Sequence, residues 1–365
     1  MIAMNDFCAE PEELVRRELE AVEKVVRSGW YVMGSELQNF EASWAARCGV
    51  RAAVGVGNGM DAIEIGLRAL GIGTGDEVIT TSMTAFATVL AIIRAGATPV
   101  LADIDPETAL LDPDSVERCL SPRTRAVLLV HLYGQMRTME RWEKLCEQAG
   151  IYLLEDCAQS HAAVWRGKVA GSIGHWGAYS FYPTKNLGGM GDGGALVTDA
   201  EEIAAKSRVL RNYGQVQRYQ HPELGLNSRL DELQAALLSV RLGWLDRFTE
   251  MRRKIAETYD GGICNTMIQL MAKPLERENH VHHLYVIRCP ERDRLAAYLQ
   301  NHGVSCLIHY PIPVHHQQPC SGVRIDPHGL SHAEHHAATC LSIPCHPQMR
   351  DTDVAHVLAT INEFK

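Results

Sequence analysis

Short apolar runs recur along the first two-thirds of the chain, and stretches with the polar and apolar spacing of helices separate them. Strands that are apolar on both faces are typical of a parallel sheet covered by helices on both sides, so the alternation predicts a large α/β domain. We expect strands at Ala52–Val56, Glu77–Thr81, Pro99–Ala102, Ala126–Val130, Ile151–Leu154, Ala178–Phe181 and Ala195–Val197. We expect helices between them at Asp61–Leu70, Thr84–Ala95, Asp112–Leu120 and Thr138–Gln148.

The last third of the chain has a different pattern of apolar and polar residues. Leu230–Asp260 has the pattern of one long helix, and the shorter elements after it indicate a smaller α+β domain. These elements are a weakly patterned stretch, a strand, a helix, a strand and a final helix, at Gly261–Lys273, His283–Arg288, Glu291–His302, Val304–Ile308 and Asp351–Phe364. We therefore expect a large domain over residues 1–245, with an N-terminal helix at Glu10–Ser28, and a small domain over residues 246–365.

Composition narrows the class of protein. The chain has 365 residues and a formal net charge of −9, with no cluster of Lys and Arg, so we expect no nucleic-acid partner. It has no apolar run of the length that a signal peptide or a membrane span needs, so we expect a cytoplasmic protein with no membrane partner. The 11 cysteines lack zinc-ligand spacing and their odd number argues against a closed disulfide framework, so we expect reduced thiols. Some of the 17 histidines cluster, one group with helical spacing, but no cluster comes with an acid that would complete a catalytic metal site, so we expect no metal.

Lys185 is a candidate catalytic residue. It follows the apolar run Ala178–Phe181 and lies between Pro183 and a glycine-rich segment, Gly188–Gly194. Burial lowers the pKa of an amine, and a neutral amine is what forms a Schiff base with an aldehyde cofactor. A solvated lysine beside a turn would show the same pattern, and spacing alone does not decide between the two.

Asp156 favours the catalytic interpretation of Lys185. It comes just after the expected strand Ile151–Leu154, and a carboxylate there can keep a pyridine nitrogen protonated, which makes the ring an electron sink. A role as the cap of a following helix would explain Asp156 but not Lys185. The two residues together are the minimum needed for pyridoxal phosphate chemistry.

A glycine-rich turn between a strand and a helix is a candidate phosphate site. In Gly55–Asp61 the strand runs through glycines into a helix start, where free N–H groups and the helix dipole attract anions. Such turns also occur for packing reasons, and this one has neither dinucleotide nor P-loop spacing. Ser180 offers a hydroxyl that would complete a phosphate cup.

These segments resemble the DegT/StrS family of sugar aminotransferases, and the resemblance runs over nearly the whole chain. The landmarks that recur in order are Gly34–Glu36, Val56–Gly59, Thr84–Thr88, Ala95–Val100, Val130–Gly134, Glu155–His161, Ser180–Gly189, Gly225–Ala236 and His309–Pro313. The resemblance implies the fold of fold-type I pyridoxal 5′-phosphate enzymes, with a mostly parallel sheet in the large domain and a smaller α+β C-terminal domain.

The resemblance also implies a set of cofactor contacts. Lys185 matches the Schiff-base lysine, and the other matched positions are Asp156 at the pyridine nitrogen, Gln159 near the phenolic oxygen, and Ser180 with the Gly59 and Met60 amides at the phosphate. Asn227 matches an asparagine that reaches the phosphate from the neighbouring subunit. A homodimer with shared active sites follows from that match.

Three positions depart from the family's pattern. Met60 replaces a Thr or Ser, which leaves only its backbone donor for the phosphate. Ala85 replaces an aromatic residue that stacks on the cofactor ring in many members, and we expect the neighbouring Phe86 to point elsewhere if the segment is helical. Cys320 replaces a frequent aromatic residue after the His-Tyr-Pro loop.

The resemblance implies transamination of a nucleotide-linked keto-sugar with L-glutamate as the donor. Members that act as dehydratases have histidine in place of the lysine, so Lys185 favours transamination. Two segments, Thr84–Thr88 and Asn212–Gly214, together with Tyr219 and Asn227–Glu232, are similar to the subgroup that aminates C3 of a dTDP-linked 3-keto-6-deoxyhexose. Amination of a 4-keto sugar, or a non-catalytic regulatory role on the same fold, are the alternatives.

Five aromatic residues are candidates for contacts with the sugar or its diphosphate. They are Tyr182, Tyr213, Tyr219, His309 and Tyr310. For the tyrosines, packing in the core or filling a subunit interface would be equally consistent with the sequence.

Overall fold

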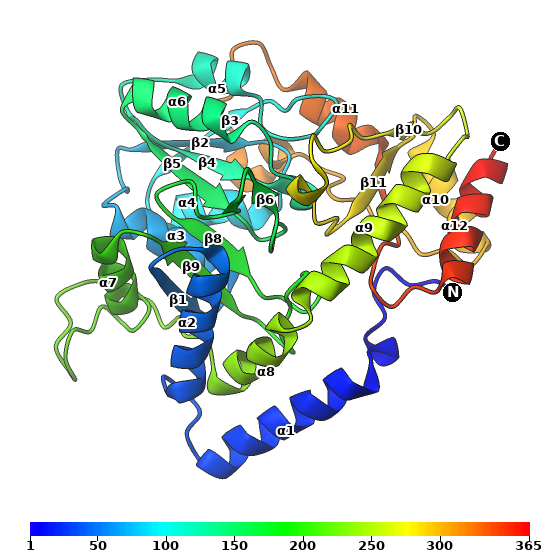
Figure 1. Cartoon of the computed structure of the whole chain (residues 1–365). Helices are drawn as coiled ribbons and strands as arrows, with labels where there is room; N and C mark the ends of the chain where they lie inside the picture. The colour runs from blue at the N-terminus through cyan, green and yellow to red at the C-terminus, as the bar shows by residue number, and fades with distance from the viewer.

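The computed structural model describes all residues from Met1 to Lys365, and a seven-stranded sheet forms its centre (Figure 1). The strand order is β1-β9-β8-β5-β4-β2-β3, in which β9 runs antiparallel to both neighbours and the other strands are parallel to one another. The strands are β1 (Ala52–Val56), β2 (Glu77–Thr81), β3 (Thr98–Ala102), β4 (Thr124–Val130), β5 (Tyr152–Asp156), β8 (Gly177–Ser180) and β9 (Gly194–Thr198). All seven predicted strands are confirmed, with ends that differ by at most two residues.

Helices cover both faces of this sheet (Figure 1). Alternate residues of a strand face opposite sides, so Val127 and Leu129 pack into one apolar cluster while Ala126 and Leu128 pack into another. This double burial explains the continuous apolar runs. The helices of this part are α2 (Ser35–Cys48), α3 (Gly59–Ala69), α4 (Phe86–Arg94), α5 (Pro113–Cys119), α6 (Met139–Ala149), α7 (Glu201–Leu210) and α8 (Glu232–Leu242).

Helix α2 was not predicted, and a residue far along the chain caps it. The Glu232 carboxylate accepts hydrogen bonds from the backbone N–H groups of Gly34, Glu36 and Leu37, at 2.8, 2.8 and 3.0 Å. A carboxylate at a helix N-terminus accepts hydrogen bonds from N–H groups that have no partner within the helix, and its negative charge complements the helix dipole. The helix packs Phe40 and Trp44 into the core.

A second sheet, of three antiparallel strands, forms the C-terminal part of the chain. It has the order β10 (Gln269–Leu270), β11 (Tyr285–Arg288), β12 (Cys340–Ile343), and an apolar cluster lies between it and its helices. Helices α9 (Leu245–Gly262), α10 (Arg292–Asn301) and α12 (Asp351–Glu363) contribute to this cluster, whereas α11 (Ser331–Thr339) packs into a separate cluster with Val286 and Cys340. The N-terminus lies near the start of helix α12 and the C-terminus follows the end of that helix, so both chain ends belong to this part of the molecule (Figure 1). The domain boundary after residue 245 stays a prediction.

Two predicted elements of this region are wrong. The long helix Leu230–Asp260 is two helices, α8 and α9, which separate at Gly243 and Trp244. Glycine weakens a helix, but no proline marks this break and the apolar pattern continues across it, so nothing in the sequence indicated two helices. The strand expected at Val304–Ile308 forms only single bridges, from Val304 to Ile2 and from Leu307 to Ser342.

The remaining elements are shorter, apart from the N-terminal helix. Helix α1 (Glu12–Ser28) matches the predicted N-terminal helix and ends at Gly29, whose φ of 66° is left-handed. A small hairpin joins β6 (Val164–Trp165) to β7 (Lys168–Val169), and 3₁₀ turns occur at Phe7–Ala9, Leu132–Gly134, Arg277–Asn279, Val314–His316 and Gln318–Cys320. None of the helices combines the length and apolarity that a membrane crossing needs.

Candidate active site

The candidate site lies at the carboxyl edge of the parallel strands. Strands β1, β4, β5 and β8 end there, and the chain leaves them at Gly57, His131, Cys157 and Phe181. Ligands of open α/β sheets collect outside this edge because several strand ends and helix starts converge on it. The sequence placed both Asp156 and Lys185 at strand ends, and the structure brings these strand ends to one edge.

Asp156 is the last residue of β5 and is 5% exposed. Its carboxylate accepts hydrogen bonds from Thr88 Oγ1 at 2.8 Å and from the Ala158 N–H at 3.1 Å. Burial raises the pKa of Asp156, and the two hydrogen bonds and the charge of Lys185 oppose this effect. Thr88 in turn bonds Thr84 at 2.9 Å, so helix α4 holds the carboxylate from one side.

Lys185 is half-buried in a turn in which its N–H donates to the Tyr182 carbonyl at 2.9 Å. Burial lowers the pKa of its amine to about 8, and the charge of Asp156 partly opposes that shift. The solvated surface lysine that the sequence left open is therefore not what the chain forms. A substantial fraction of the amine is neutral near pH 8, as nucleophilic bonding to an aldehyde requires.

Three histidines lie within electrostatic reach of the Lys185 amine. Burial, followed by the lysine charge, lowers the pKa of His161 to about 3, that of His309 to about 4, and that of His283 well below its usual value. All three are uncharged at neutral pH. The three imidazoles therefore surround the amine with polar groups but place no second positive charge beside it.

The start of helix α3 lies against the end of β8. A Cβ on Gly59 would lie 2.7 Å from the Ser180 Cβ, so only glycine lets the helix start approach Ser180 this closely. Asn58 caps the helix through the Asp61 N–H at 2.9 Å, which leaves the N–H groups of Gly59 and Met60 without intrahelical acceptors. The sequence-predicted phosphate residues Gly59, Met60 and Ser180 are thus neighbours.

Gln159 connects the sheet edge to the C-terminal part of the chain. Its Oε1 accepts a hydrogen bond from the Tyr133 N–H at 2.6 Å, and its Nε2 donates to the Tyr310 hydroxyl at 3.2 Å. Burial raises the pKa of Tyr310 to about 12, and the nearby Asp156 charge adds to this. Tyr310 therefore stays a neutral hydroxyl close to Gln159 and Asp156.

The candidate substrate residues fall into three places. Tyr182 and His309 line one cavity of about 240 Å³, and Tyr310 lines another of about 140 Å³ with Phe86 and Thr84. Tyr213 and Tyr219 lie on the loop between α7 and α8, outside both cavities, and are 44% and 79% exposed.

Asn227 lies on that same loop. Its side chain is exposed, and its backbone pairs with Asn212 at the base of the loop. The guanidinium of Arg229 lies 5.1 Å from the Tyr213 ring, so the loop carries a cation and an aromatic face beside Asn227.

One of the departures from the family's pattern, Cys320, and the neighbour of another, Phe86, pack in one apolar cluster. Ala85 caps α4, and the next residue, Phe86, packs against a buried group that contains Val89, Val314 and Cys320. The expectation that Phe86 points elsewhere than the stacking position agrees with this packing. Cys320 is 2% exposed and fills part of the same cluster.

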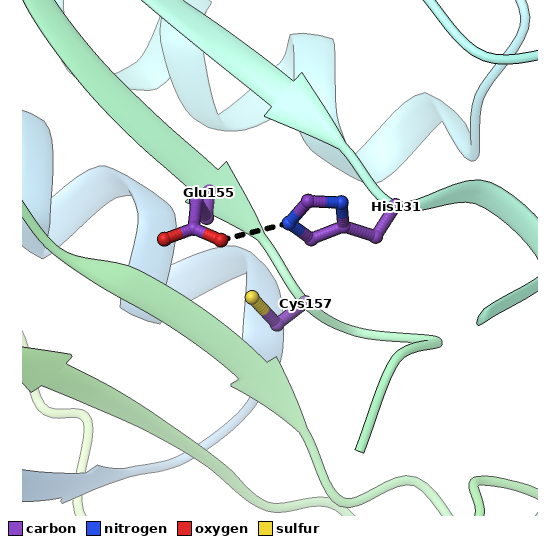
Figure 2. A group of neighbouring side chains, drawn as sticks. All are labelled: His131, Glu155 and Cys157. Atoms are coloured by element: carbon purple, nitrogen blue, oxygen red, sulfur yellow. Dashed lines mark hydrogen bonds and ion pairs between the residues drawn. The ribbon is translucent and has the colours of Figure 1, made fainter. Parts of the chain in front are cut away.

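Two groups of side chains have ligand atoms close enough together to raise the question of a metal ion. One is His131, Glu155 and Cys157, and the other is His315, His316 and Glu334. The first is buried and lies at the ends of β4 and β5, with Glu155 and Cys157 on either side of Asp156 in the sequence (Figure 2). In the second, Glu334 is exposed and lies 3.1 and 3.5 Å from the two histidines.

The sequence model of the DegT/DnrJ/EryC1/StrS aminotransferase family matches residues 12–362. The chain belongs to this family. The aminotransferase is 42% identical, over all of its length and 98% of the relative's, to the "Pleiotropic regulatory protein" of Geobacillus stearothermophilus. It is also 42% identical to the "dTDP-3-amino-3,4,6-trideoxy-alpha-D-glucose transaminase" of Streptomyces venezuelae, over 98% of this chain and 95% of that one.

The fold agrees with that of solved family members. Streptomyces venezuelae DesV, solved in complex with a ketimine intermediate, superimposes with a TM-score of 0.94 at 42% identity, covering 99% of this chain and 98% of that chain. The aminotransferase therefore has the fold-type I architecture, and pyridoxal 5′-phosphate is its cofactor. The buried Asp156, the amine of Lys185 and the Gly59–Ser180 contact fit this cofactor's pyridine nitrogen, aldehyde and phosphate.

The sequence analysis assigned no individual role to four residues of the site, Thr88, Tyr133, His161 and His283, although the first three lie in segments that it named. Thr88 was within reach of prediction, since it lies one helical turn after Thr84 on the expected helix. The others depend on how the chain folds over the strand ends. Tyr133 has a φ of 62°, and His283 comes from the C-terminal part of the chain, so no local pattern indicates either.

Proposed function

We propose that the aminotransferase transfers an amino group from L-glutamate to C3 of a dTDP-linked 3-keto-6-deoxyhexose. The observation that carries the proposal is the pair of Asp156 and the low-pKa Lys185 at one sheet edge. The named activity of the Streptomyces venezuelae relative supports the choice of a nucleotide-linked amino sugar. A cytoplasmic location remains a prediction from the sequence.

Lys185 and Asp156 have complementary roles in this proposal. Bound pyridoxal phosphate supplies a ring that accepts electrons when the Cα–H bond of the donor breaks. Asp156, kept in place by Thr88 and Ala158, is the carboxylate that holds the pyridine nitrogen protonated. Lys185 would hold the cofactor through its aldehyde carbon, and the same Nζ, when free, would take the proton from Cα of the donor and return it as a general acid.

The other predicted contacts orient the cofactor. Gln159 would contact the phenolic oxygen, and Ser180 with the N–H groups of Gly59 and Met60 would hold the phosphate at the helix start. The neutral histidines limit competing charge near Lys185. We place Tyr182, His309 and Tyr310 at the sugar because they line the cavities next to the lysine turn and the Asp156 side of the site.

The active sites are shared within a homodimer in this proposal. Asn227, Tyr213 and Tyr219 lie on one exposed loop, outside the cavities of their own chain. An exposed loop that carries an amide, two aromatic rings and Arg229 suits contact with the phosphate and sugar of a neighbouring subunit. A symmetric dimer would supply this contact twice.

Product identification tests the sugar and the position together. We expect the holoenzyme, incubated with L-glutamate and a dTDP-3-keto-6-deoxyhexose, to give a 3-amino sugar by NMR, with 2-oxoglutarate formed in equal amount. Lys185→Ala is the control and should give no product. Turnover of a 4-keto sugar in preference to the 3-keto sugar would replace the C3 assignment with the 4-amino alternative. Absence of turnover with either would favour a regulatory role.

A further inference from the structure

Glu155 is a fully buried carboxylate one residue before Asp156. It is 0% exposed and accepts four hydrogen bonds: from the N–H groups of Gly171, Ile173 and Gly174 at 2.9, 2.9 and 2.7 Å, and from His131 Nε2 at 2.8 Å. Burial alone would raise its pKa, but the His131 bond and the backbone donors hold the pKa below its usual value. Glu155 is therefore ionised inside the protein.

His131 lies at the end of the neighbouring strand and bonds β5 twice. Its backbone N–H donates to the Asp156 carbonyl at 3.1 Å, and its side chain points at the Glu155 carboxylate (Figure 2). Because an ionised carboxylate only accepts, Nε2 carries the hydrogen of this bond.

The geometry connects Glu155 to both halves of the site. Successive strand residues face opposite sides of a sheet, so Glu155 and Asp156 are fixed together but point apart. The loop Gly171–Gly174, whose N–H groups bind Glu155, leads directly into β8, which carries Ser180 and then Lys185. That loop is tightly packed, since a Cβ on Gly174 would lie 2.6 Å from the Leu153 carbonyl oxygen.

A metal ion is a poor occupant of this cluster. The hydrogen bonds to Glu155 use both of its oxygens twice, which leaves no free lone pair for coordination. Burial raises the pKa of the Cys157 thiol well above its usual value, so the third group is a neutral thiol and not the thiolate that binds zinc.

We propose that Glu155 and His131 form a positioning pair that fixes Asp156 relative to the β8 strand and Lys185. This inference rests on the proposed cofactor roles of Asp156 and Lys185. Neither member of the pair touches the cofactor or the substrate in this proposal. Glu155 acts by holding the end of β4, the end of β5 and the loop before β8 together, so that the carboxylate and the amine are already in place before the cofactor binds.

The test compares two isosteric substitutions of buried carboxylates. In Glu155→Gln the amide N–H₂ faces donors, so at least one of them loses its acceptor. The matched control is Glu77→Gln. Glu77 is 2% exposed and accepts bonds of 2.6 Å from Ser121, Arg123 and Arg324, but it begins β2 at the opposite edge of the sheet. Both variants should melt at lower temperature than the parent.

The first readout is the dissociation constant of pyridoxal phosphate, measured by titrating the apoprotein. The second is steady-state kinetics, which give kcat and the KM of the sugar separately. We expect Glu155→Gln to weaken cofactor binding about tenfold or more and to lower kcat, with the KM of the sugar changed by less than about twofold. Glu77→Gln should leave the cofactor constant within about twofold of the parent. If Glu155→Gln does not fold, His131→Leu replaces it in the same comparison with Glu77→Gln.

Three results would overturn the inference. Cofactor binding by Glu155→Gln equal to that of the parent, with only a lower melting temperature, would reduce the pair to a general stabilising role. Stoichiometric metal in the purified parent that is lost from Glu155→Gln would make the cluster a metal site. A parent that binds no pyridoxal phosphate would overturn the proposed function together with this inference, whereas the first two results leave the proposed function intact.

Discussion

At the scale of single residues, burial acts on Asp156 and Lys185 in opposite directions. It raises the pKa of the acid and lowers that of the amine, and the attraction between the two charges opposes both shifts. The result is an amine with a pKa of about 8 beside a carboxyl group that Thr88 and the Ala158 N–H keep available as an acceptor. Such a pair suits a site that must bond an aldehyde and hold a pyridinium proton.

This arrangement predicts the pH dependence of cofactor bonding. Because the neutral amine is the nucleophile, the rate at which the apoprotein bonds pyridoxal phosphate should rise with pH through about 8. In Asp156→Asn the charge that raises the pKa of Lys185 is gone, so the midpoint should move to lower pH while the affinity for the cofactor falls. Stopped-flow absorbance across a pH series measures both, and Glu77→Gln is the control. A midpoint that stays or rises in Asp156→Asn would contradict the proposed pairing.

The sequence indicated Lys185 and Asp156 because each follows an apolar run, and strand ends of one sheet meet at one edge. It did not indicate His161 or His283. Their closeness to Lys185 depends on how the chain turns after β5 and on how the C-terminal part packs against the sheet. Such contacts join residues far apart in sequence and leave no periodic signal.

At the scale of elements, the loop between α7 and α8 stands apart from the rest of the site. Every other predicted cofactor residue lies on a strand end, at a helix start or in the turn after β5 or β8, whereas Asn227 lies on an exposed loop. The proposed role of this loop at a neighbouring site accounts for its exposed aromatic residues, Tyr213 and Tyr219.

Complementation between two inactive variants tests this loop. Lys185→Ala lacks the amine, and Asn227→Glu places a negative charge against the phosphate. We expect each homodimer to be inactive or nearly so. Randomly mixed dimers should recover about one quarter of the parent's activity, because half of them are mixed and each mixed dimer has one intact site. The assay is kcat after joint refolding, and no recovery would show that Asn227 serves its own subunit.

At the scale of the whole molecule, local patterns predicted most of the large sheet but not its assembly. Continuous apolar runs gave all seven strands, since burial on both faces is encoded in each run. Helix α2 was missed although it packs Phe40 and Trp44 into the core, because its capping group, Glu232, comes from much later in the chain. The break between α8 and α9 was missed because the apolar pattern continues across Gly243.

The central claim is that Lys185 holds pyridoxal phosphate for amino transfer, and the visible spectrum of the purified holoenzyme tests it most directly. We predict a yellow protein whose visible band is bleached by L-glutamate and restored by 2-oxoglutarate, together with a Lys185→Ala variant that lacks the lysine-bound band. A Lys185→Ala variant with the parent's band, or a parent whose band does not respond to L-glutamate or any other amino acid, would contradict the claim.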